Sequence, residues 1–137
     1  MYEPIRTKSV HTVAEGTQPG LPRRTREEEL DIRLAGHLTA LLTVTDELRV
    51  LTPSASLDAA AQELAAHAGR LAGGRVPLRA EPSAVRDDAA HVASLHARAR
   101  TLAGNALAVA SSRGDEAVTA LMTARLAAHA DVEGALV

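Results

Sequence analysis

Hydrophobic residues recur in steps of three and four along most of this chain, which is the spacing of one face of an α-helix. Four stretches share the pattern, at about residues 25–52, 54–72, 83–112 and 115–136. Alternating steps of three and four also indicate helices that pack nearly parallel or antiparallel to their neighbours. The sequence therefore predicts an all-α protein.

Each stretch carries its apolar positions on one stripe, and the first, third and fourth stripes each contain a polar member. The four stripes are Leu30, Leu34, His37, Leu41, Val44, Leu48 and Leu51; Leu57, Ala61, Leu64, Ala68 and Leu71; Val85, Asp88, Val92, Leu95, Ala99, Leu102, Ala106 and Val109; and Val118, Leu121, Met122, Leu126, His129, Val132 and Leu136. Four amphipathic helices in succession favour an up-down four-helix bundle.

A residue of a type that favours the N-cap of a helix stands at the start of each stretch. Thr25 and Glu28 have the spacing of a capping box, in which each side chain accepts a hydrogen bond from the other residue's backbone N–H. The other N-caps are predicted at Ser54 or Ser56, at Ser83 and at Asp115. Stop signals follow at Pro53, at Gly73 with Gly74, and at Gly114.

Residues 1–24 contain three prolines and two glycines, too many for a helix. We expect an irregular N-terminal arm over 1–24 and one bundle domain over 25–137, since 137 residues suit a single core. The stretch 5–13 is rich in β-branched residues. It is consistent either with a disordered tail or with a strand that adds to a partner's sheet.

The composition narrows the packing and the partners. Phe and Trp are absent and Tyr2 is the one aromatic, so Ala and Leu must fill the core between closely spaced helices. A net charge of -2 favours neither nucleic acid nor an anionic membrane. With no cysteine, no basic and apolar leader and no apolar run near 18 residues, a cytoplasmic protein is expected.

No catalytic motif is found: the chain has no Gly-rich phosphate loop, no nucleophile elbow and no His-Glu-x-x-His helix. The sequence therefore favours a non-enzymatic bundle that acts through protein–protein interaction or self-association, without a cofactor. The candidate partner-binding residues lie in the arm and at its junction with the bundle: Ile5, Val10, Val13, Arg23 and Arg24. The arginines of the junction are equally consistent with a solvated surface.

The histidines support an alternative, a bundle that binds a metal or a small ligand. In an up-down bundle, His37, His67 and His129 each lie ~18–21 Å along the axis from a helix start, and His96 falls within about a turn of that level. Four imidazoles in one layer could hold a divalent transition metal. The other interpretation is that His67 and His96 face solvent while His37 and His129 are histidines at the edge of the core, bonded to a neighbouring hydroxyl such as Thr39.

Overall fold

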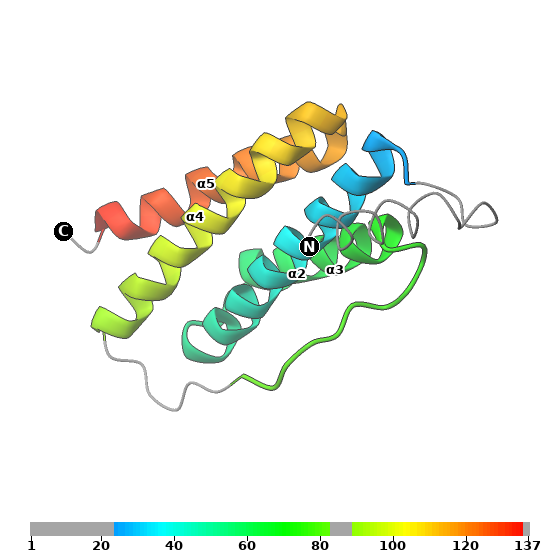
Figure 1. The fold of residues 1–137 in the computed structure, drawn as a ribbon. Helices are drawn as coiled ribbons and strands as arrows, with labels where there is room; N and C mark the ends of the chain where they lie inside the picture. The colour runs from blue at the N-terminus through cyan, green and yellow to red at the C-terminus, as the bar shows by residue number, and fades with distance from the viewer. Residues whose placement is uncertain (1–23, 83–88, 136–137) are drawn as a thin grey trace, which may run out of the picture.

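The computed structural model describes residues 24–82 and 89–135, and within them the chain forms four α-helices and no strand (Figure 1). The helices are α2 (Arg26–Leu51), α3 (Ala55–Leu71), α4 (Ala89–Arg113) and α5 (Glu116–Ala135). The all-α four-helix bundle is thereby confirmed. None of these four helices has an apolar run long enough to cross a membrane.

The predicted caps of three helices are confirmed. The Thr25 hydroxyl accepts a hydrogen bond from the backbone N–H of Glu28 at 3.0 Å, and the Glu28 carboxylate accepts one from the backbone N–H of Thr25 at 2.8 Å. Ser54 and Asp115 each accept a hydrogen bond from the backbone N–H three residues further along. Most of the arm (1–23) and the predicted cap Ser83 lie outside the described residues, as do Val85 and Asp88.

Neighbouring helices are antiparallel, but the chain does not visit them in up-down order. Asp31 near the start of α2 pairs with Arg113 at the end of α4, with Oδ1 and Nε 2.9 Å apart. Arg70 near the end of α3 pairs with Asp115 at the start of α5, with Nη2 and Oδ2 2.9 Å apart. The helices α3 and α4 therefore run in the same direction, and the strict up-down order predicted from the sequence is corrected to up-down-down-up.

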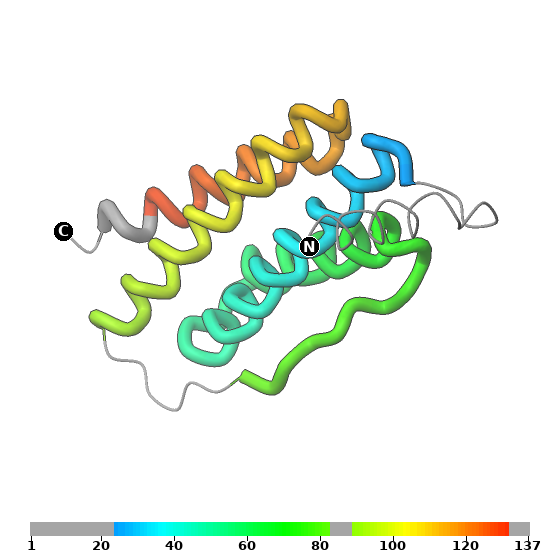
Figure 2. The backbone as a smooth tube through the Cα atoms, in the orientation of Figure 1, coloured from blue at the N-terminus to red at the C-terminus, as the bar shows by residue number. Residues whose placement is uncertain are grey.

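The segment after α3 makes this order possible, because residues 72–82 run back beside the α2–α3 hairpin toward the end at which α3 begins (Figure 2). Gly73 and Gly74 have φ values of 76° and 90°, which let the chain leave α3 in a tight turn. When extended, the chain between Leu71 and Ala89 is long enough to span α3, a helix of 17 residues.

We call residues 72–82 the crossover segment, and a buried carboxylate holds this segment against the bundle. Asp46 of α2 accepts hydrogen bonds from Nε and Nη2 of Arg79, at 3.0 and 2.6 Å, and a third from Nη1 of Arg49 at 3.1 Å. Burial opposes ionisation of this carboxyl group, but the bonds from Arg79 and Arg49 outweigh it and lower the pKa of Asp46.

The core consists mainly of leucines from α2 packed on small residues from α4. Leu34, Leu38 and Leu41 of α2 are fully buried. The facing positions on α4 are four fully buried alanines, Ala99, Ala103, Ala106 and Ala110. Helix α2 contacts both α3 and α4, while α4 contacts α5. The prediction of a close-packed Ala and Leu core is consistent with this arrangement.

Candidate functional site

The structure brings two of the four candidate histidines together. His96 is ~10 Å from the start of α4 and His129 ~9 Å from the end of α5, and these two ends lie side by side because α4 and α5 form an antiparallel hairpin. His67 lies toward the opposite end of the bundle, with its Nδ1 2.9 Å from Nη2 of Arg70. His37 is half-buried near the middle of α2. The mid-height layer expected for an up-down order is therefore lost, because the α4–α5 hairpin runs in the reverse direction.

His96 and His129 form a buried pair. Their Nδ1 atoms are 2.8 Å apart, with ring centroids separated by 5.1 Å and ring planes inclined by 51°. The side chains are 4% and 1% exposed. Burial, and after it the nearby Arg125 and His96, together lower the pKa of His129 to about 4. His129 is therefore neutral at pH 7.

Arg125 lies one helical turn before His129 and is also buried, at 7% exposure. Its Nη2 is 3.4 Å from Nε2 of His129, and its Nε has no hydrogen-bond partner. Among the residues described here, no carboxylate forms an ion pair with it. Burial lowers the pKa of Arg125, and the more distant charge of Glu63 on α3 partly opposes this. A guanidinium group nevertheless stays protonated at neutral pH.

These three side chains line one wall of a cavity of about 370 Å3, which we name the Arg125 cavity. The turn before α3 and the first turn of that helix also line the cavity, and its surface is mainly apolar. The other lining residues are Thr52, Ser54, Ser56, Leu57, Val92 and Ala128. The cavity thus joins an apolar interior, a buried positive charge and the start of a helix, whose free N–H groups carry partial positive charge.

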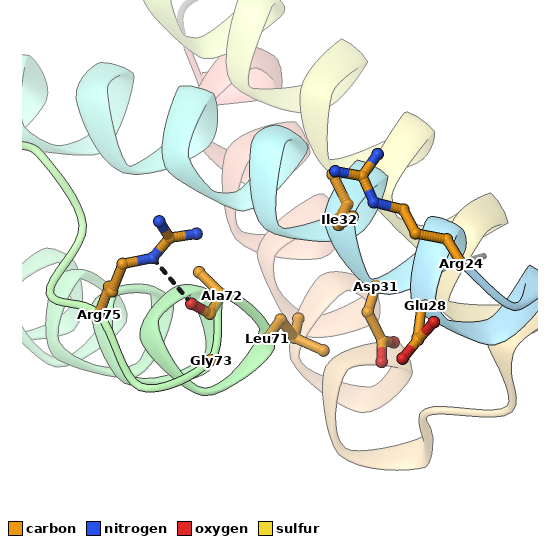
Figure 3. Close-up of a pocket in the computed structure, with 8 residues that line it drawn as sticks. All are labelled: Arg24, Glu28, Asp31, Ile32, Leu71, Ala72, Gly73 and Arg75. Carbon is orange, nitrogen blue, oxygen red and sulfur yellow. Dashed lines mark hydrogen bonds between the residues drawn. The ribbon is translucent and has the colours of Figure 1, made fainter. Parts of the chain in front are cut away.

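A second cavity, of about 420 Å3, lies between the start of α2 and the end of α3 and mixes charges of both signs (Figure 3). Glu28 and Asp31 lie side by side on α2, whereas Arg75 is bonded through its Nε to the backbone oxygen of Ala72. The candidate residue Arg24 lines this cavity and is exposed. The charged groups of this second cavity are solvated or paired, so the second cavity is less suited than the Arg125 cavity to select a ligand.

The other candidate residues do not gather into a site. Ile5, Val10, Val13 and Arg23 lie outside the described residues. In residues 24–82 and 89–135, no three His, Cys, Asp or Glu side chains lie close enough together to hold a metal ion. The buried charge of Arg125 beside the histidine pair also repels a cation. The transition-metal site stays a prediction, and the geometry of this pair does not fit it.

Comparison of the chain with protein-family models, with curated proteins and with solved structures finds no match. The function must therefore be inferred from the Arg125 cavity and its own residues.

Arg125 is the buried charged residue of this cavity that the sequence did not reveal. Arginines are usually exposed, and this one was not placed on the apolar stripe of its helix. The spacing carries a signal, since Val118, Met122, Arg125 and His129 follow one another in steps of four, three and four. All four are buried on the inner face of α5.

Proposed function

We propose that this protein is a helical bundle that binds a small organic molecule in the Arg125 cavity. The observation that carries the proposal is an apolar cavity of ligand size with a buried polar cluster on one wall. Small-molecule sites in proteins have this character: mostly apolar walls with a few polar groups that orient the ligand. At ~30 Å3 for each water, about 370 Å3 leaves room for on the order of ten non-hydrogen atoms.

The energetic cost of the buried cluster supports the same proposal. Burying the polar and charged groups of His96, His129 and Arg125 costs free energy, and hydrophobic side chains at the same positions would avoid this cost. Polar groups kept in an otherwise apolar bundle at the wall of a cavity are common at functional sites. A bound molecule would exclude water from the cavity and could give the Nε of Arg125 a partner.

Three probes that share one ring test the proposal: benzoate, benzyl alcohol and benzylamine. We expect saturable binding of at least one of them, followed by NMR titration, with the largest amide shifts at Leu57, Val92 and Ala128. Ala128→Phe should fill the cavity and abolish binding. Ala127→Phe is the matched control, because Ala127 is exposed on the same helix and should bind as the native protein does. If none of the probes binds saturably, or if both variants bind equally, the proposal is wrong.

Protein–protein interaction, self-association and a cytoplasmic location remain predictions of the sequence. They are compatible with a ligand-binding bundle but draw no support from the Arg125 cavity.

A further inference from the structure

We infer that the ligand of the Arg125 cavity is an organic carboxylate whose charged end pairs with Arg125. This inference rests on the proposed function, and it specifies the chemical class of the ligand. It starts from the unmatched charge of Arg125, whose side chain is more than nine-tenths buried at the cavity wall. In the part of the chain that the structure describes, its single polar contact is the 3.4 Å approach to a neutral imidazole.

The charge balance of the cavity favours an anion. A buried cation without a counter-charge is costly, and an anionic ligand would supply that counter-charge inside the cavity. The first turn of α3 adds to the positive potential, because Ser54 and Ser56 of that turn line the cavity and the positive end of the helix dipole lies there. Glu63 is the carboxylate whose charge acts on Arg125, but it forms no ion pair with it.

The donor geometry of the Arg125 guanidinium favours a carboxylate over a phosphate. Nε and Nη2 of a guanidinium lie on one edge, which matches the two oxygens of a carboxylate. His129 cannot add a donor at Nε2, since that atom faces a donor, Nη2 of Arg125. Beyond Arg125, the lining side chains that carry donors are the hydroxyls of Thr52, Ser54 and Ser56, and that of Thr52 already donates to the backbone oxygen of Leu48. The mainly apolar surface of the cavity suits the apolar body of an organic carboxylate better than a phosphate dianion. His129 thus acts as a positioning residue for the guanidinium.

The three ring probes, with inorganic phosphate as a fourth, test this inference on the full chain. Native protein should bind benzoate about tenfold more tightly than benzyl alcohol, and benzylamine and phosphate more weakly than either. Arg125→Met should lower benzoate affinity about tenfold and leave benzyl alcohol affinity within about twofold. Arg98→Met is the matched control, because Arg98 is exposed on α4, and it should change neither affinity.

A second measurement needs no variant and covers the case in which Arg125→Met does not fold. The 1H–15N signal of Arg125 Nε should shift downfield when benzoate is added and should not shift with benzyl alcohol. Equal affinity for benzoate and benzyl alcohol, a preference for benzylamine or phosphate, or an unmoved Nε signal would overturn the inference while leaving small-molecule binding intact. Absence of binding by every probe would instead overturn the proposed function itself.

Discussion

His96 and His129 face each other through the same ring atom, with 2.8 Å between their Nδ1 nitrogens. A hydrogen bond needs one donor and one acceptor, so in the neutral pair a single Nδ1 carries the proton. Arg125 decides which one, because its Nη2 donates toward Nε2 of His129 and makes that atom an acceptor. The proton of His129 is therefore on Nδ1, and Nδ1 of His96 accepts it.

We expect opposite tautomers for the two rings. Long-range 1H–15N correlation spectra at pH 7 should show His129 as the Nδ1–H tautomer and His96 as the Nε2–H tautomer. The same tautomer for both rings, or a charged ring at this pH, would contradict the contacts described. Arg125→Met removes the donor that determines which Nδ1 carries the proton, and in this variant we expect the two rings to exchange tautomers.

The protein should lose stability as the pH falls from about 6.5 to about 4. The folded-state pKa of His129 is lowered to about 4, so between these values the unfolded chain binds a proton that the folded one does not. The stabilisation is complete above pH 6.5 and amounts to about 3 kcal/mol at most, at 1.4 kcal/mol per pKa unit. Chemical denaturation at pH 7.0 and at pH 4.5 measures the loss.

The variant His129→Gln removes the titrating group and should flatten the pH dependence in this range. His37→Gln is the control, since His37 lies on α2 outside the pair, and it should retain the native pH dependence. A His129→Gln protein that loses as much free energy of unfolding as the native one would show that other groups cause the acid effect.

Asp46 should contribute more to stability than its neighbour Asp58. Asp46→Asn leaves Arg79 and Arg49 without the buried carboxylate that holds the crossover segment, and we expect a loss of about 2 kcal/mol in free energy of unfolding. Asp58 accepts one bond from Arg49 and its side chain is 59% exposed. Asp58→Asn should therefore cost less than about 0.5 kcal/mol. Equal losses by urea denaturation would show that the crossover is not fastened at Asp46.

Local signals in the sequence were sufficient for the helices but not for their order. The caps at Thr25, Ser54 and Asp115 depend on residues at most three positions apart, so the sequence shows them directly. The direction of α4 depends on where a segment of glycines, prolines and exposed residues returns. The connecting segment is long enough for either direction of α4. The pairing of Arg79 with Asp46 favours the observed direction, and these two residues are 33 positions apart in the sequence.

The sequence predicted the inward position of one histidine of the site but not the arrangement of the helices that surround it. The stripe of α5 marked His129 as inward-facing, and the structure buries it. His96 stands one residue after a stripe position, and it is buried because α5 packs against that side of α4. Expecting a single layer depended on the up-down order. The α4–α5 hairpin brings His96 beside His129, and its reversed direction places the pair near the start of α3, while His67 lies near the opposite end.

The up-down-down-up order can be tested by distances, because the chain has no cysteine and accepts spin labels only where they are introduced. Ile32 and Ser112 are exposed neighbours of the paired residues Asp31 and Arg113, so labels there leave that ion pair intact. The pair Ile32→Cys with Ser112→Cys should give a short distance in pulsed electron resonance, on the order of two helix diameters or ~20 Å.

The matched pair is Ile32→Cys with Ala89→Cys, which moves the second label to the other end of α4. At 1.5 Å per residue this end lies ~35 Å further along the axis, so the second distance should be clearly longer than the first. In a strict up-down order the two distances would be reversed, because the start of α4 would then lie beside the start of α2. A long distance for the first pair and a short one for the second would therefore refute the crossover and, with it, the position of the histidine pair beside the start of α3.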